Sequence, residues 1–173
     1  MRKSILRVQA RAVRGRGVVF HASAVVHGRK GILFLAPSGG GKSTAAAILA
    51  ESGFEVIGDD STVVSRGTDG TWRVISCATW TWQSGRRPGP VELESLILLE
   101  KGEPGCLSRL SPVYAFYRIL RDEAIMAYGD VTPEEKPDFR NSVSEICGGF
   151  PVFLLRYSNK ESILNLLRYN RIC

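Results

Sequence analysis

Residues 31–44 read GILFLAPSGGGKST, and this stretch decides the fold. The short apolar run Gly31–Leu35 is typical of a buried strand. Three glycines follow it. The alanine-rich segment Lys42–Glu51 then predicts a helix, with Gly53 as its C-terminal cap. A strand, a glycine-rich turn and a helix in this order predict an α/β domain built around the loop Ala36–Ser43.

The loop fits the phosphate-binding pattern G-x-x-x-x-G-K-[ST], with Ala36 in place of the first glycine. Glycines let successive backbone N–H groups turn towards phosphate oxygens, and the helix start adds the positive end of its dipole. The pattern places Lys42 on the β- and γ-phosphates and the Ser43 hydroxyl on magnesium. A glycine-rich turn that caps a helix without a ligand is the alternative, and the flanking strand and helix disfavour it. We expect ATP or another nucleoside triphosphate, with Mg²⁺, to bind at Ala36, Pro37, Ser38, Gly39, Gly40, Gly41, Lys42, Ser43 and Thr44.

Strand and helix signals continue on both sides of this core, and we expect one domain over residues 1–173 with a mixed sheet and flanking helices. Alternating or short apolar runs predict strands at 4–13, 18–26, 54–57, 62–65, 71–78, 91–100 and 151–157. Capping and periodicity predict helices at 112–121, 141–147 and 160–168. The polar, proline-bearing stretch 130–138 predicts a connection.

Charge, cysteine spacing and the length of apolar runs favour some partners and locations and disfavour others. The net charge of +6 and the pI of about 9.4 favour anionic partners such as nucleotides. Nucleic acid is disfavoured as a partner, because the N-terminal arginines have no aromatic residues between them. The four cysteines are widely spaced, which disfavours a zinc or redox motif. Apolar runs shorter than a membrane span and a basic N-terminus that lacks a signal-peptide core lead us to expect a cytoplasmic protein.

An acidic pair, Asp59-Asp60, follows a short predicted strand, 17 residues after Lys42. One carboxylate beside the phosphate loop would hold magnesium, and a second would accept a proton from an attacking hydroxyl. Neighbouring strand residues point to opposite faces, so both carboxylates serve one site only if the chain bends, which Gly58 would allow. The alternative is a plain turn, because GDDS is good turn composition.

Two further groups have open interpretations. Arg86 and Arg87 lie in a loop rich in glycine and proline, where they would either neutralise a transferring phosphoryl group or be solvated. Trp80 and Trp82 alternate along a strand, and core packing is favoured over stacking on a nucleobase or gripping a peptide.

The segment HASAVVHGRKGILFLAPSGGGKSTAAAILAESGFEVIGDD, residues 21–60, resembles the catalytic core of the HPr kinase/phosphorylase family. That family is related to phosphoenolpyruvate carboxykinase. Its pattern is a histidine, a strand pair, the phosphate loop, a helix and an Asp-Asp pair. Here 15 residues separate His21 from Ala36, and 23 separate Ala36 from Asp59. The resemblance implies a phosphate-loop nucleotide-binding fold of the HPr kinase/phosphoenolpyruvate carboxykinase-like type.

The resemblance also implies roles. His21 would orient the phosphoryl site together with Lys42, Asp59 would be the base towards a serine or similar hydroxyl, and Asp60 would support magnesium with Ser43. The two aspartate roles could be exchanged. The acceptor would be a protein, a peptide or a small molecule, and related kinases suggest a homo-oligomer. The family's extra N-terminal domain and its downstream glycine-rich signature are not found.

Three functions therefore stay open from the sequence. The first is an ATP- and magnesium-dependent kinase acting on a hydroxyl group. The second is a nucleotide-binding regulatory or assembly module without transfer activity. The third is a small-molecule phosphate-loop kinase of the adenylate-kinase type, which is disfavoured because such enzymes usually carry the loop on the first strand.

Overall fold

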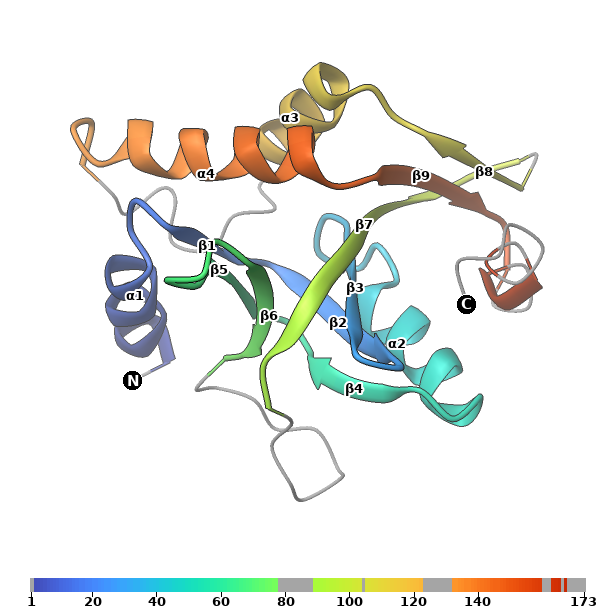
Figure 1. Ribbon diagram of the computed structural model, residues 1–173. Helices are drawn as coiled ribbons and strands as arrows, with labels where there is room; N and C mark the ends of the chain where they lie inside the picture. The colour runs from blue at the N-terminus through green and yellow to red at the C-terminus, as the bar shows by residue number, and fades with distance from the viewer. Residues whose placement is uncertain are drawn as a thin grey trace.

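The computed structural model describes residues 2–77, 89–103, 105–122, 132–159, 163–165 and 167. It confirms a mixed sheet with helices against it (Figure 1). The helices are α1 Arg2–Ala12, α2 Lys42–Glu51, α3 Pro112–Arg121 and α4 Lys136–Gly149. The strands are β1 Gly17–Phe20, β2 Ala22–His27, β3 Lys30–Leu35, β4 Glu55–Gly58, β5 Thr62–Arg66, β6 Trp72–Ser76, β7 Val91–Lys101, β8 Cys106–Arg109 and β9 Val152–Tyr157.

Strand direction is what positions the site. The order along the sheet is β1-β5-β6-β7-β3-β2-β4, and β9 pairs with β7 and β8. β3 and β9 both run parallel to β7, while β2 is antiparallel to β3 and to β4. β3, β4, β7 and β9 therefore all run in one direction. Their carboxyl ends lie at the same edge of the sheet, which is where open α/β sheets bind ligands.

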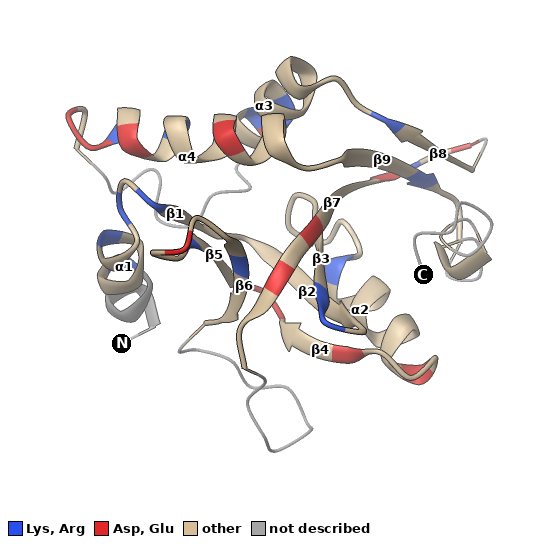
Figure 2. Ribbon diagram, in the orientation of Figure 1, with Lys and Arg blue, Asp and Glu red and all other residues tan. Residues whose placement is uncertain are grey.

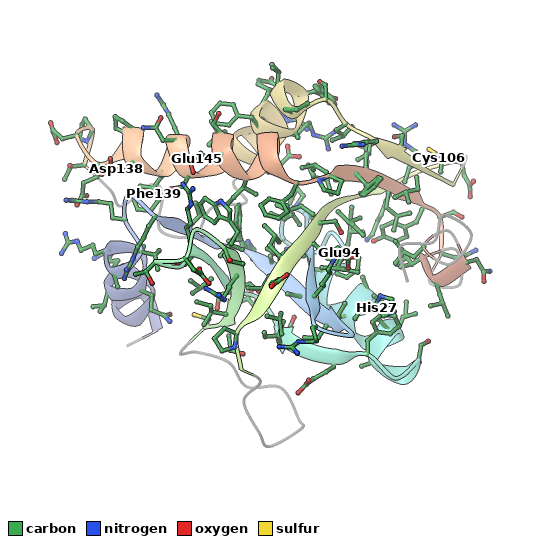
Figure 3. The ribbon with its side chains drawn as sticks, viewed as in Figure 1. His27, Glu94, Cys106, Asp138, Phe139 and Glu145 are labelled. Carbon is green, nitrogen blue, oxygen red and sulfur yellow. The ribbon has the colours of Figure 1, made fainter. Side chains whose placement is uncertain are left out.

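β7 is the longest strand and joins the two parts of the sheet. β3 pairs along one of its edges, from Glu92 to Leu98. The other edge is divided: Val91 and Glu92 pair with β6, and the segment 96–101 pairs with β9. Opposite Gly31 and Ile32 of β3 the register shifts, leaving Glu94 as an extra residue in β7 (Figure 3). Such an insertion is a β-bulge.

Each face of the sheet has its own apolar core. Alternate residues of the strands pack with α3 and α4 on one face, where Ala115, Ile119, Val143 and Ile146 are buried. α2 covers the opposite face through Ala45, Ala46 and Leu49, together with Ile163 and Leu167. α1 packs separately on β1, where Ala10 meets Val19 and Phe139. The rigid strands between these layers carry the loops of the candidate site.

Ion pairs connect the segment after α1 with the start of α4. The acidic start of α4 faces the basic segment after α1 (Figure 2). There Arg14 contacts Glu135 at 2.9 Å and Asp138 at 3.4 Å. Nearly half of the Arg14 and Asp138 side chains is exposed, so we expect these ion pairs to add little to stability. None of the helices within the described residues has the length and hydrophobicity needed to cross a bilayer.

The structure corrects several sequence-based predictions. Residues 4–13 were expected as a strand, but α1 covers almost all of them. The strand expected over 18–26 is divided at His21 into β1 and β2. β8 was not predicted, and α4 begins inside the stretch expected as a connection. Of the expected C-terminal helix, residues 163–165 and 167 are described and are helical. Four residues named above lie outside the described part: Trp80, Trp82, Arg86 and Arg87.

Candidate phosphate-binding site

Five chain segments meet at the carboxyl edge of the parallel strands. β3 leads into the loop Ala36–Gly41, and β4 leads into Asp59 and Asp60. β7 ends at Lys101, and β9 ends at Tyr157. β2 runs the other way and begins beside the end of β3, with Ala22 opposite Leu35. The residue before β2 is His21, so the histidine reaches the same edge.

The glycine loop adopts a backbone that favours glycine. Gly39 and Gly41 have φ values of 74° and 88°, in the left-handed region. The N–H of Gly40 donates to the Pro37 carbonyl at 3.0 Å, and α2 begins directly after Gly41. The hydroxyl of Tyr157 donates to the Gly40 carbonyl at 3.1 Å. The loop therefore sits at the positive end of α2, and a buried tyrosine supports it from β9.

Lys42 is held inside the loop. The residue is buried, with 6% of its surface accessible to solvent. Its ammonium donates to the carbonyls of Ala36 at 2.8 Å and Pro37 at 3.1 Å. Burial lowers the pKa of Lys42, and the charges of Asp60 and Asp59 act in the opposite direction. The ammonium is thus held by carbonyls of the glycine loop, next to the N-terminal end of α2, where an anion would be favoured.

Asp59 contacts the first turn of α2. Its Oδ1 accepts hydrogen bonds from the Ser43 hydroxyl at 2.7 Å and from the Ser23 hydroxyl at 2.8 Å. A hydroxyl and a carboxylate are oxygen ligands that Mg²⁺ prefers, usually with phosphate and water completing the shell. Ser43 and Asp59 thus fit a magnesium ion bound with a nucleotide. In the described residues no group of three or more His, Cys, Asp or Glu side chains forms a metal site by itself.

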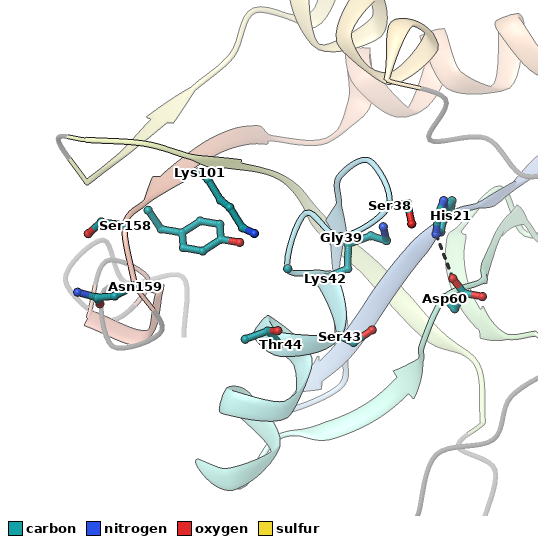
Figure 4. Close-up of a pocket in the computed structure, with 12 residues that line it drawn as sticks. His21, Ser38, Gly39, Lys42, Ser43, Thr44, Asp60, Lys101, Ser158 and Asn159 are labelled. Atoms are coloured by element: carbon teal, nitrogen blue, oxygen red, sulfur yellow. Dashed lines mark hydrogen bonds and ion pairs between the residues drawn. The ribbon is translucent and has the colours of Figure 1, made fainter.

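Asp60 provides the bend that the two carboxylates need. Its φ is 65°, the one non-glycine residue with positive φ in the described chain. Gly58 is not in this region, so the bend lies two residues later than expected. The turn brings Oδ1 of Asp60 to 3.0 Å from Nε2 of His21, which donates to it (Figure 4). Left-handed backbone costs a non-glycine residue about 1–2 kcal/mol and is concentrated at functional sites.

Two cavities adjoin these groups. The larger, of about 510 Å³, is lined by His21, Asp60, Lys42, Ser43 and the ends of β7 and β9 (Figure 4). Asp59 does not line it. The smaller, of about 360 Å³, shares His21 and Ser38 with the first and extends to the end of α3. The shared residues place the two cavities next to each other across the histidine.

The structure brings together most of the residues singled out from the sequence. Ser38, Gly39, Gly41, Lys42, Ser43 and Thr44 line the larger cavity with His21 and Asp60. Sequence reasoning missed Lys101, Tyr157, Ser158 and Asn159, which also line it. The signal was available: residues 151–157 form an apolar run followed by the polar pair Ser158-Asn159. A strand parallel to β3 brings such a pair to the edge of the sheet that carries the glycine loop.

Comparison with known proteins gives three findings. A search of solved structures finds the HPr(Ser) kinase/phosphatase from Coxiella burnetii, at 14% sequence identity and a TM-score of 0.45. That similarity covers 89% of this chain and 96% of that chain. No curated protein matches this chain in sequence. The family model "SynChlorMet cassette protein ScmC" matches residues 1–103, which include the whole glycine loop and the acidic pair. Since the match covers more than half of the 173 residues, the chain belongs to the ScmC family.

Proposed function

We propose that this protein transfers the γ-phosphoryl group of Mg·ATP, or of another nucleoside triphosphate, to a hydroxyl group. One observation carries the proposal. Two side-chain pairs, Ser43–Asp59 and His21–Asp60, meet at the turn after β4, next to a loop that holds a buried lysine. The first pair suits magnesium and the second suits a proton acceptor. Phosphoryl transfer needs both functions at one phosphate group.

In the proposed reaction the acceptor hydroxyl oxygen forms a bond to the γ-phosphorus, and the bond from that phosphorus to the β–γ bridging oxygen breaks. The leaving diphosphate keeps the bridging oxygen and its electron pair. The hydroxyl proton passes to Asp60, whose carboxylate His21 orients. Magnesium, when bound, neutralises charge on the phosphate oxygens. The products are a phosphate ester, the nucleoside diphosphate and one proton.

This proposal exchanges the two aspartate roles that the family resemblance implied. Asp59 accepts hydrogen bonds from the hydroxyls of Ser43 and Ser23, and its pairing with Ser43 supports the magnesium role. Asp60 lines the cavity, and 44% of its side chain is exposed, which supports the proton-acceptor role. The third function considered above receives no support, because the sheet is mixed and not parallel throughout.

The test compares two variants, each of which replaces one aspartate of the pair by asparagine. Asp60→Asn should lower transfer from γ-labelled ATP by about 10²–10⁴-fold and leave Mg·ATP binding nearly unchanged, because it removes a general base. Asp59→Asn should instead raise the Mg²⁺ concentration needed for binding, measured by calorimetry. Retained transfer in Asp60→Asn would defeat the mechanism. Mg·ATP hydrolysis or binding without any labelled acceptor would favour a nucleotide-binding module.

A further inference from the structure

The smaller cavity extends to the carboxyl end of α3, and a network of arginine–carboxylate hydrogen bonds ties this helix end to β7. Arg118 is buried and donates to Glu100 of β7 at 3.1 Å and to Asp122 at 3.0 Å. Glu100 also accepts from Arg156 of β9 at 2.8 Å. Arg121 in turn donates through Nε to the other oxygen of Asp122 at 2.7 Å. This ladder fixes the carboxyl end of α3 against the strands that carry the phosphate site.

One arginine of this ladder, Arg121, also faces the smaller cavity. Arg121 and Asp122 line that cavity with His21, Pro37 and Ser38. Both oxygens of Asp122 are already occupied by arginines. In the part of the chain that the structure describes, the terminal nitrogens of Arg121 have no hydrogen-bond partner, and its guanidinium lies over the Tyr117 ring. The wall therefore offers donors suited to a carboxylate or phosphate.

An exposed apolar stripe continues outward from Arg121. Four large apolar side chains are exposed among those described, and three of them lie on α3: Val113, Tyr114 and Tyr117. At 100° per residue these three and Arg121 occupy about 100° of the helix circumference, opposite buried Ala115 and Ile119. The stripe is thus one continuous surface that leads into the smaller cavity.

We propose that the smaller cavity and the α3 stripe bind the phosphoryl acceptor, and that the acceptor is an acidic peptide segment. This inference rests on the proposed function. A carboxylate of the peptide pairs with Arg121, which places a neighbouring hydroxyl beside His21 and Asp60. Apolar peptide side chains lie on Tyr117 and Val113. From Arg121 to Val113 the helix rises about 12 Å, the length of about three to four extended residues.

The charge of the whole chain agrees with this occupant. At +6, the protein attracts acidic segments over distances beyond direct contact. A second copy of this basic chain would carry the same net charge and is a poorer fit to Arg121. Tyrosine side chains with one arginine, at the mouth of a cavity, also have the composition of residues that dominate binding to polypeptides.

The experiment uses the full chain, Mg·ATP labelled on the γ-phosphate, and a positional-scanning library of short peptides with one central serine. The expected result is selection for Asp or Glu next to the serine and for apolar residues three to four positions further. Arg121→Gln should reduce the acidic selection about tenfold, and Arg121→Glu should shift it towards Lys or Arg. Tyr117→Ser should remove only the apolar selection. The matched controls are Arg29→Gln in the β2–β3 turn and Val8→Ser on α1, both exposed and remote from the cavities.

Several outcomes would overturn the inference. Labelled small hydroxyl compounds without any labelled peptide would refute the peptide acceptor and leave the proposed function standing. Peptide labelling with no acidic selection, or with selection that survives both Arg121 variants, would refute the role of Arg121. A dimer that Tyr117→Ser dissociates, seen by light scattering, would assign the stripe to self-association. No labelled product of either class, with Mg·ATP bound, would remove both proposals.

Discussion

The backbone of Asp60 shows how one residue can sacrifice stability for a site. Its left-handed φ of 65° is less favourable than it would be for glycine, although aspartate adopts it more readily than most residues, and it turns the carboxylate towards His21. We expect Asp60→Gly to be more stable than Asp60→Ala by about 1 kcal/mol, since glycine relieves the strain and loses some of this gain to its greater freedom when unfolded. Urea denaturation measures the difference. Equal stabilities would show that the turn is not strained.

The lowered pKa of Lys42 leads us to expect that the protein takes up protons when it binds a nucleotide. Burial lowers the pKa of its ammonium, and a triphosphate placed against it would supply negative charge that raises the pKa again. At alkaline pH, where a fraction of the lysine has lost its proton, nucleotide binding should therefore take up protons. Calorimetry in buffers of different ionisation enthalpy measures this uptake. Lys42→Met should abolish it, and Lys30→Met, exposed at the start of β3, should not.

The residue-level site was predictable where residues lie near the loop in sequence or in a known spacing. The loop and the acidic pair were singled out from their residue types and spacing, and His21 from the family resemblance alone; the structure brings these groups to one edge of the sheet. Lys101 and Tyr157 were not identified. A lone lysine or tyrosine carries no pattern, and its place at the cavity depends on the pairing of β7 with β3 and β9.

Among the elements, the glycine loop is fitted closely to β9. A Cβ on Gly41 would collide with the hydroxyl of Tyr157, and the residue also has a φ of 88°. We expect Gly41→Ala to reduce Mg·ATP affinity by at least about tenfold, because the loop must move to accept a methyl group. Adding Tyr157→Phe should restore part of the loss, because only the hydroxyl is removed.

Gly53→Ala is the matched control for that experiment. Gly53 has a φ of 92°, similar to that of Gly41, and open space where its Cβ would lie. It carries the same backbone strain without the collision. Equal losses of nucleotide affinity in Gly41→Ala and Gly53→Ala would show that Tyr157 is irrelevant to the loop.

The ladder that holds α3 should make the protein sensitive to acid. Hydrogen bonds from Arg156 and Arg118 lower the pKa of Glu100. Burial would raise the pKa of Asp122, but bonds from Arg121 and Arg118 outweigh it and lower that pKa. Both pKa values lie below those of the unfolded chain, about 4. The stabilisation is therefore complete above about pH 4.5 and is lost as the pH falls through the folded-state values.

Glu100→Gln tests this element directly. It should cost about 1–2 kcal/mol near neutral pH, a value reduced because a third of the Glu100 side chain is exposed. It should also flatten the fall in stability below pH 4, measured by thermal unfolding across pH. Glu103→Gln, an exposed change in the following turn, should do neither. An unchanged acid profile in Glu100→Gln would place the sensitivity elsewhere.

Elements with strong local signals were predicted well, and elements defined by distant partners were not. α2 and α3 were predicted with the bounds that the structure shows, because the alanine-rich sequence and the Ser111-Pro112 start act locally. α1 was mistaken for a strand, since its arginines and apolar residues alternate in part. β8 has only four residues and owes its strand conformation to pairing with β9. Such pairing leaves little trace in a short sequence.

At the scale of the whole molecule, β7 should be the most protected segment. It has β3 on one edge, β6 and β9 on the other, and apolar layers on both faces. We expect the amides of residues 96–99 to exchange with deuterium most slowly, at a rate set by global unfolding. β8 pairs with β9 alone and should exchange sooner. Hydrogen exchange read by mass spectrometry tests the order.

The fold class could be predicted from the sequence, but the order in which the strands pair could not. The sequence indicated a mixed sheet with flanking helices, which the structure confirms. It did not indicate that β7 would divide one edge between β6 and β9, because strand order depends on contacts between residues far apart in the chain. The convergence of five segments on the edge that carries the glycine loop follows from that order.

The extra residue at Glu94 has a consequence for how the chain tolerates change in length. Leu93 shares one apolar layer with Leu96 and Leu98, whereas Ile97 and Leu99 belong to the opposite layer. Before Glu94 the odd-numbered residues of β7 face the first layer, and after it the even-numbered residues do. Deleting Glu94 would place Leu93 two positions before Leu96, where strict alternation keeps both on their present face, so this deletion should harm the fold far less than deletion of a regularly paired residue such as Ile97, which would turn one part of the strand over.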